Sequence, residues 1–197
     1  MMKGEPNMLG YAFCGSFCTH ERSIQVLRSL LKEGFEIQPI MSETVFATDT
    51  RFGKAEDLRK TVEELCGRPV IHSIVDAEPL GPKRPLEALV ICPCTGNTLA
   101  KIAGGVTDTA VCMAAKAHLR ENRPLILALS SNDSLSANLS NLAILLNRKQ
   151  IFFVPMVQDD PISKPHSLVA DFKRVPETLY DALVGKQPRP LFLTSGN

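Results

Sequence analysis

The sequence predicts an α/β fold in three layers, in which a doubly wound parallel sheet of about six strands lies between two layers of helices. Short apolar segments alternate with segments of helical spacing from residue 8 to about residue 155, and this alternation is typical of repeated β-α-β units. The length of 197 residues suits one domain with a sizeable core. We therefore expect a single Rossmann-like or flavodoxin-like domain over residues 1–197, with a looser C-terminal segment from about residue 156.

The first half of the chain supplies three of the expected strands. Residues 8–14 are apolar and end at a Gly-Ser pair, which predicts a buried strand that enters a tight turn. A helix with one apolar face follows, and residues 35–41 read as the second strand. Residues 42–52 are polar and rich in threonine, so we expect a loop there before a helix at 54–66. Residues 70–75 read as the third strand.

The second half continues the pattern. Residues 88–92 are entirely apolar and stop at Pro93, which predicts a buried strand. The other predicted elements are a helix from about 98, a helix at 107–120, a strand at 124–129, a helix at 135–147, a strand at 151–154 and a helix at 175–184. We expect the last dozen residues, which contain two prolines, to form a tail or an arm that contacts a partner.

Charge and hydropathy exclude several classes of function. The chain has 22 basic and 21 acidic side chains, so it has no electrostatic attraction for nucleic acid or for an anionic membrane. No segment approaches the roughly 20 apolar residues that a membrane-spanning helix needs. Residues 1–7 are short and polar and lack the pattern of a secretory signal. We therefore expect a cytoplasmic protein.

The six cysteines are expected to be free thiols, as in most cytosolic proteins. Cys92 and Cys94 are separated by one residue, and Cys14 and Cys18 have no matching Cys or His pair downstream. These spacings do not fit a zinc site. Cys94 precedes a predicted helix, where a thiolate is favoured, and is a minor candidate for reactivity.

Four polar turns follow four of the predicted strands, at residues 15–19, 42–44, 94–98 and 130–133. In a parallel sheet all four lie at one edge, where the helix N-termini offer free N–H groups and a partial positive charge. Glycine and small hydroxyl residues let a phosphate approach closely. For each turn alone the helix cap is the favoured interpretation, but together the four turns predict a ligand site. Neither a dinucleotide fingerprint nor a P-loop motif is present.

The four histidines have local interpretations. His20 opens the first helix near the expected crevice, and a solvated surface role is favoured over ligand contact. His72 lies within the predicted third strand and His118 late in a helix, so both are expected to be structural. His166 lies in a loop at 158–166 with two aspartates and a lysine. This loop either closes over a substrate or is simply solvated.

The segment at 93–108, PCTGNTLAKIAGGVTD, resembles the flavoprotein family of flavin-dependent cysteine decarboxylases and prenyltransferase-type flavin binders. That family has a Pro-Ala-Ser-Ala-Asn-Thr-like loop, then an Ala-Lys-Ile-Ala run, a Gly and an Asp. The matching positions are Pro93, Asn97, Thr98, Ala100, Lys101, Ala103, Gly105 and Asp108. The resemblance implies flavin mononucleotide (FMN) as cofactor and a trimer-based homo-oligomer with flavin sites between subunits.

The resemblance also implies which residues contact the cofactor. The phosphate would lie at the first two turns, near Gly15, Ser16, Thr19, Ser42 and Thr44. The ribityl chain or the ring would meet the other two turns, near Pro93, Thr95, Asn97, Thr98, Ser130 and Asn132. The sequence assigns no catalytic residue.

Four longer runs, at 42–53, 77–85, 130–141 and 153–172, extend the resemblance over nearly the whole chain. They are similar to a branch of the family whose members each form one part of a two-component oxidoreductase. This branch acts on a small cyclic dicarboxylic acid. The resemblance therefore implies a partner subunit with a nicotinamide-binding fold that carries NAD(P).

The chain also departs from the decarboxylases of the family. Their catalytic histidine has no match if His72 lies inside a strand, and Ser130 to Asp133 replace their Pro-x-Met-Asn signature. Thr95 and Gly96 replace their Ser-Ala pair. Two alternatives to an oxidoreductase component thus stay open: a non-catalytic structural partner of the nicotinamide-binding protein, and a flavin-dependent decarboxylase.

Overall fold

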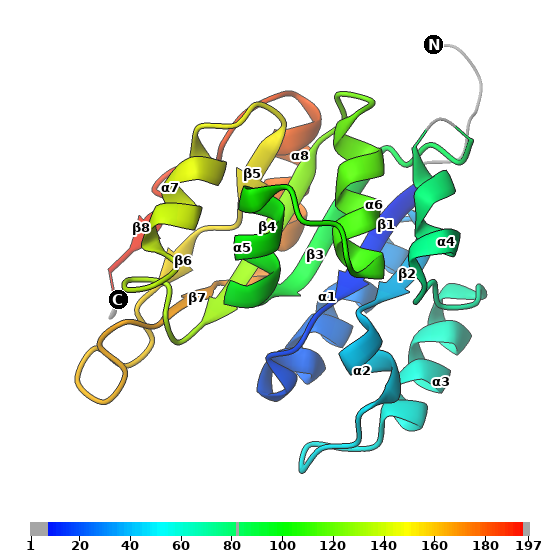
Figure 1. The fold of residues 1–197 in the computed structure, drawn as a ribbon, viewed down its shortest axis with the longest axis horizontal. Coiled ribbons are helices and arrows are strands. Elements are labelled where there is room, and N and C mark those ends of the chain that lie inside the picture. Colours follow the sequence, from blue (N-terminus) through cyan, green and yellow to red (C-terminus); the bar gives the residue numbers. More distant parts are fainter. Residues whose placement is uncertain (1–7, 82, 195–197) are drawn as a thin grey trace.

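The computed structural model describes residues 8–81 and 83–194, so the N-terminal segment considered above lies outside it. Five parallel strands form the centre of the sheet, in the order β2-β1-β3-β4-β5 (Figure 1). They are β1 (Met8–Phe13), β2 (Glu36–Met41), β3 (Ala88–Cys94), β4 (Leu125–Ser131) and β5 (Ile151–Phe153). The strand order reverses between β1 and β3, and ligands of such sheets bind outside the carboxyl ends of the strands at this point.

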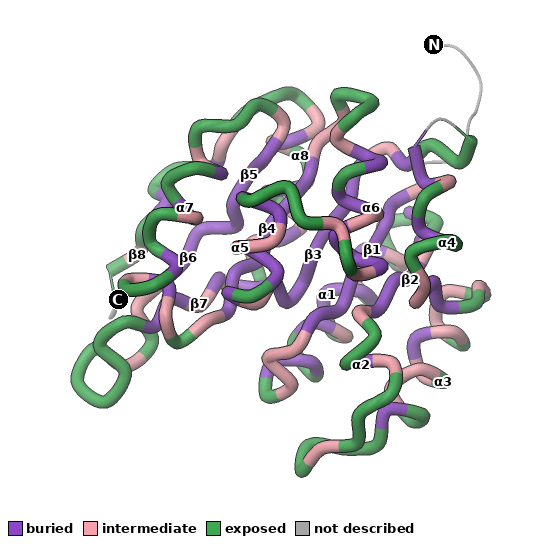
Figure 2. The backbone as a smooth tube through the Cα atoms, in the orientation of Figure 1, coloured by how far each residue is buried: buried purple, intermediate pink, exposed green. Residues whose placement is uncertain are grey.

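Helices cover both faces of the sheet. One face is covered by α1 (His20–Lys32), α2 (Glu43–Ala47), α3 (Ala55–Cys66) and α8 (Val175–Leu183). The other is covered by α4 (Ile74–Ala77), α5 (Gly96–Gly104), α6 (Ala110–Leu119) and α7 (Leu139–Leu146). All seven residues of β3 are buried, as expected for a parallel strand between two helix layers (Figure 2). The predicted three-layer, doubly wound fold is confirmed.

Three short strands extend the sheet beyond β4. They are β6 (Met156–Val157), β7 (Leu168–Ala170) and β8 (Phe192–Leu193). β7 runs antiparallel to the end of β4 and to β6, and β8 runs parallel to β6. The sheet therefore has eight strands, whereas the sequence predicted about six. The final residues up to 194 contribute an edge strand, so the prediction of a tail is wrong for this part of the chain.

Two local predictions are also wrong. Within the predicted strand at 70–75, only Ile71 forms a bridge, with Ile40 of β2. The chain then turns because Ser73 accepts a hydrogen bond of 3.1 Å from the N–H of Asp76 and so caps α4. The predicted loop at 42–52 contains α2 for the same kind of reason, since Ser42 is its N-cap residue.

None of the helices in the described part of the chain is long and apolar enough to cross a membrane.

Candidate cofactor site at the carboxyl edge of the sheet

The turns predicted to share one edge of the sheet are joined by direct contacts. The hydroxyl of Ser16, in the first turn, donates to the carbonyl oxygen of Ser130, in the fourth, at 2.7 Å. The hydroxyl of Thr98, in the third turn, lies 3.3 Å from the Sγ of Cys14. The N–H of Cys14 also donates to the carbonyl oxygen of Pro93 at 3.3 Å. The first, third and fourth turns thus form one continuous surface at the carboxyl ends of β1, β3 and β4.

No side chain caps the first turn in the described part of the chain, although the N–H of Thr19 donates to the carbonyl oxygen of Ser16 at 2.9 Å. Ser16 adopts a left-handed backbone conformation, with φ 61° and ψ 46°, before the short helix η1 (Phe17–Thr19) leads into α1. Neither Ser16 nor Thr19 caps the following helix with its side chain. Thr19 is buried, and its hydroxyl donates to the carbonyl oxygen of Ser16 at 2.8 Å, so it shapes the turn from inside. A concave turn with free N–H groups is suited to an anion.

The second turn is adjacent to the first but is more occupied. The N–H of Ser42 donates to the carbonyl oxygen of Phe13 at 3.0 Å, and its hydroxyl accepts the N–H of Val45 at 3.4 Å. Thr44 is exposed. The carboxylate of Glu43 accepts the N–H of Ala110 at 2.9 Å and therefore caps α6. Both the ligand-binding and the helix-capping interpretations of Ser42 thus remain compatible with its position.

In the third turn, Thr95 caps α5. Its hydroxyl accepts the N–H of Thr98 at 3.2 Å and donates to the Thr98 hydroxyl at 3.1 Å. Pro93 is buried at the end of β3, whereas Asn97 is exposed at the start of the helix. Of the residues predicted here, Asn97 therefore has the most accessible side chain, and Thr95 and Thr98 serve first to hold the turn.

The fourth turn contains a residue that the sequence did not single out. The carboxylate of Asp133 accepts hydrogen bonds from the hydroxyl of Ser131 and from the Nδ2 of Asn138, the latter at 2.8 Å. Ser130 is buried and Asn132 is exposed. The sequence contains one signal of this network, which is the glycine at the start of the helix. The network packs against α5 at Gly96, where a larger side chain would not fit.

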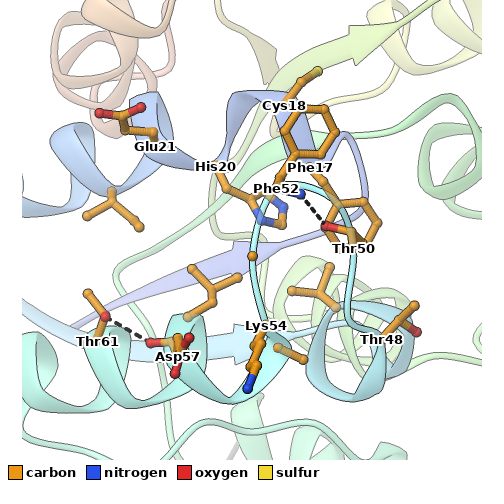
Figure 3. A pocket seen from close by; sticks show the side chains of 15 residues that line it. Phe17, Cys18, His20, Glu21, Thr48, Thr50, Phe52, Lys54, Asp57 and Thr61 are labelled. Carbon is orange, nitrogen blue, oxygen red and sulfur yellow. Dashed lines mark hydrogen bonds between the residues drawn. The ribbon is translucent and has the colours of Figure 1, made fainter.

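A cavity of about 310 Å³ lies beside the first turn, between α1 and the connection from α2 to α3 (Figure 3). Phe17, Phe52 and His20 line it, with Lys54 at its rim. His20 is buried: its Nε2 lies 2.8 Å from the carbonyl oxygen of Cys14, and burial lowers its pKa. The favoured interpretation of His20 as a solvated surface residue is therefore wrong.

His72 lies in the connection before α4 and not inside a strand. Its ring stacks on the ring of Phe46, with centroids 3.7 Å apart and planes 3° apart. The guanidinium of Arg59 lies 4.9 Å from the centroid of the same Phe46 ring. The Nδ1 of His72 is buried without a hydrogen-bond partner in the described part of the chain. The sequence argued against His72 as a match to the decarboxylase histidine because it placed His72 inside a strand. Since His72 lies outside any strand, that argument no longer holds.

Three thiols buried beneath the crevice are unreactive because of their environment. Cys14, Cys94 and Cys112 are buried at the junction of β1, β3 and α6. Burial raises the pKa of Cys14 to about 12 and raises the pKa of Cys94 well above its usual value. Neutral thiols are poor nucleophiles. Cys94 is therefore not the reactive thiol that its place before a helix suggested.

Comparison with known proteins shows the family of the chain. The Flavoprotein family model matches residues 2–178. The chain belongs to the Flavoprotein family. The resemblance inferred from the segment at 93–108 is confirmed.

Within the Flavoprotein family, the chain is similar to proteins of one kind along nearly its whole length. The B subunit of dipicolinate synthase of Bacillus subtilis (strain 168) is 45% identical over 185 residues, which cover 94% of this chain and 92% of that protein. The crystal structure of the dipicolinate synthase B subunit from Bacillus halodurans C matches with a TM-score of 0.88 and 38% identity, over 95% of this chain and 96% of that one.

A more distant solved structure shares the fold. The FMN-dependent cysteine decarboxylase SpaF matches with a TM-score of 0.65 and 21% identity, over 89% of this chain and 96% of that one. The fold of this chain is therefore also that of an FMN-dependent enzyme.

Proposed function

We propose that this Flavoprotein-family chain is the B subunit of a dipicolinate synthase and helps to oxidise dihydrodipicolinate to dipicolinic acid in the cytoplasm of a sporulating bacterium. The observation that carries the proposal is the 45% identity to the Bacillus subtilis protein over 94% of the chain. The match spans the crevice as well as most of the remaining chain. The reaction removes two electrons and two protons from the substrate ring. NAD(P) on the partner, the A subunit of dipicolinate synthase, would supply the final acceptor for the two electrons and one proton, and the other proton would be released to water.

We infer that the crevice binds flavin mononucleotide, which would supply a two-electron carrier when bound. The uncapped turn at Gly15 and Ser16 would hold its phosphate through backbone N–H groups, with Ser42 and Thr44 beside it. Thr19 would keep this turn in shape. The ribityl chain or ring would meet the residues of the third and fourth turns, which are Pro93, Thr95, Asn97, Thr98, Ser130 and Asn132.

A single preparation tests the cofactor and the assembly together. The purified chain should show a flavin absorbance spectrum, or should quench the fluorescence of added FMN with saturation. Size-exclusion chromatography of the same sample should give a homo-oligomer built from trimers. A colourless protein that ignores saturating FMN would contradict the cofactor proposal.

A second candidate function is a non-catalytic partner that stabilises the A subunit. It is favoured by the hydroxyls of Ser42 and Thr95, which already cap α2 and α5 and so need no ligand to explain them. The rate of dipicolinate formation by the isolated A subunit decides between the two. An unchanged rate on addition of this chain, with only a gain in thermal stability, would support the structural role.

The position of His72 keeps decarboxylation as a third candidate, since its ring lies in the connection before α4 with an unpartnered Nδ1 in the part of the chain that the structure describes. Release of carbon dioxide from a peptide that ends in cysteine would establish it. We expect no such release, because the identity of 45% is to a synthase component.

A further inference from the structure

The start of α5 is covered by a carboxylate of the protein itself. An ideal Cβ placed on Gly96, the first residue of α5, would lie 2.6 Å from Asp133 Oδ1, and equally close to Ser131 Oγ and Asn138 Nδ2. Only glycine therefore allows the fourth turn to pack this closely on the helix. The contact brings a negative charge to the positive end of the helix dipole, where it is stabilised.

The carboxylate of Asp133 is held in a fixed orientation. Ser131 donates to its Oδ1 and Asn138 donates to its Oδ2 at 2.8 Å. Asn141 in turn donates to the Oδ1 of Asn138 at 2.9 Å, which orients that amide. A carboxylate has about four lone-pair positions, so Asp133 retains the capacity to accept further hydrogen bonds from a ligand.

The helix starts along this edge differ in charge. The start of α6 receives the carboxylate of Glu43 at 2.9 Å, and the start of α5 receives Asp133. The turn at Ser16 receives no capping side chain, and the exposed side chain of Glu21 points away from Phe17 and Cys18 (Figure 3). The edge thus has one helix start open to an anion beside two that carry an anion already.

The turn that contains Asp133 is joined to the first turn. Ser130 is 6% exposed, and its backbone carbonyl oxygen accepts the hydroxyl of Ser16 at 2.7 Å. This contact ties the turn that contains Asp133 to the uncapped first turn, so a ligand held at the first turn lies close to the fourth.

We propose that Asp133 is a specificity-determining residue of the cofactor crevice. Its carboxylate accepts hydrogen bonds from a hydroxyl or N–H group at the start of α5 and repels an anionic group from that position. The cofactor is thereby oriented in one direction, with its phosphate at the first turn and its hydroxyl-bearing part at α5. The identity of the cofactor as a flavin rests on the function proposed above, whereas the exclusion of anions does not.

The Asp133→Asn variant tests this role, with two probes that differ in charge. Inorganic phosphate reports on anion binding alone, and riboflavin carries the hydroxyls and the ring without the phosphate. Dissociation constants should be measured at low ionic strength, at about 20 mM salt, because surface charges are screened within roughly 10 Å at 0.1 M. The matched control is Glu64→Gln, which removes one negative charge from an exposed position of α3. Thermal unfolding of each variant checks that it is folded.

The two probes should shift in opposite directions. In Asp133→Asn, phosphate should bind at least about fivefold more tightly, since a repelling charge is removed. Riboflavin should bind at least about threefold more weakly, since a charged acceptor is replaced by a neutral one. Glu64→Gln should change neither constant by more than about twofold, because the effect of an exposed distant charge is screened.

Each result decides a separate claim. Phosphate binding that is no tighter in Asp133→Asn than in the unaltered chain overturns the exclusion of anions, including the case in which neither protein binds phosphate. Riboflavin binding that is unchanged or tighter overturns the role of Asp133 as an acceptor. If no protein in the set binds riboflavin or FMN, the flavin proposal fails, while the phosphate comparison still decides whether Asp133 excludes anions.

Discussion

Ser16 and Ser130 connect the first and the fourth turns of the crevice through a hydrogen bond of 2.7 Å, from the Ser16 hydroxyl to the Ser130 carbonyl oxygen. The two residues are 114 positions apart in the chain. Ser16 has a left-handed backbone, and Ser130 is buried near the end of β4. The geometry of the open turn therefore depends on the end of a strand that the chain forms much later.

Replacing Ser16 by glycine should weaken cofactor binding with little effect on stability. Glycine adopts a positive φ without strain, which offsets the loss of a hydrogen bond worth about 1 kcal/mol. FMN affinity should fall by about five- to tenfold, because the turn is no longer tied to β4. The control is Asn122→Gly, since Asn122 also has a positive φ, of 55°, but lies in the turn after α6. Fluorescence titration with equal affinities for the two variants would refute the prediction.

Two glycines of α5 should respond oppositely to alanine. A Cβ on Gly96 would lie 2.6 Å from three polar atoms of the fourth turn, so Gly96→Ala should destabilise the fold by about 1–3 kcal/mol through overpacking. A Cβ on Gly104 would meet only Val106 Cγ2, at 3.8 Å. Gly104→Ala should therefore be neutral or stabilising by up to about 1 kcal/mol, from helix propensity. Urea unfolding of both variants gives their free energies of unfolding. Similar values would contradict the prediction and show that the fourth turn can move away from Gly96 at little cost.

Most of the fold could be predicted because the central strands are buried on both faces. β1 and β3 appear in the sequence as continuous apolar segments for that reason. The segment at 70–75 is also apolar in part, but only Ile71 pairs, because Ser73 starts a helix two residues later. The strands after residue 155 have two or three residues each, too short for a periodic signal.

The positions of the four turns could be predicted, whereas the roles of single side chains could not. Parallel topology alone brings the ends of β1, β3 and β4 to one edge. Whether Thr95 faces a ligand or caps α5 depends on one hydrogen bond of 3.2 Å to the N–H of Thr98. The importance of Asp133 depends on its contact with Gly96. A glycine at a helix start indicates that something packs closely there, but no local pattern reveals which later turn it is.

The stability of the fold should depend on pH through His118. Its Nε2 donates to the carbonyl oxygen of Pro124 at 2.9 Å, and burial lowers its pKa from 6.5 to about 4. The unfolded chain therefore binds more protons than the folded chain in this range, so His118 makes the fold less stable as pH falls below 6.5. The loss between about pH 7 and pH 5 should be about 2 kcal/mol.

The His118→Gln variant isolates this contribution, because glutamine keeps a donor for Pro124 but does not titrate in this range. Urea unfolding of both proteins at the two pH values gives the difference. The variant should lose about 2 kcal/mol less than the unaltered chain as the pH falls. Equal losses would assign the acid sensitivity to carboxylates instead.

The thiols should separate into three classes of reactivity. Cys18 in η1 is exposed, Cys66 is half-buried with its pKa raised to about 11 by burial, and the other four are buried. Ellman's reagent at about pH 8 should therefore modify one thiol quickly and a second slowly, because the reacting species is the accessible thiolate. All six should react after unfolding. Cys18→Ser should remove the fast phase, and a fast phase that persists would show that a buried thiol opens to solvent.

The same reaction reports on the crevice, because Cys18 belongs to the turn proposed to hold the phosphate. Saturating FMN should slow the fast phase at least about threefold, by covering the N–H groups of η1 and excluding the reagent. Riboflavin, which lacks the phosphate, should protect Cys18 less than FMN at equal saturation. Equal protection by the two flavins would mean that the ring, lying in the cavity lined by Phe17 and Phe52, covers Cys18 instead of the phosphate.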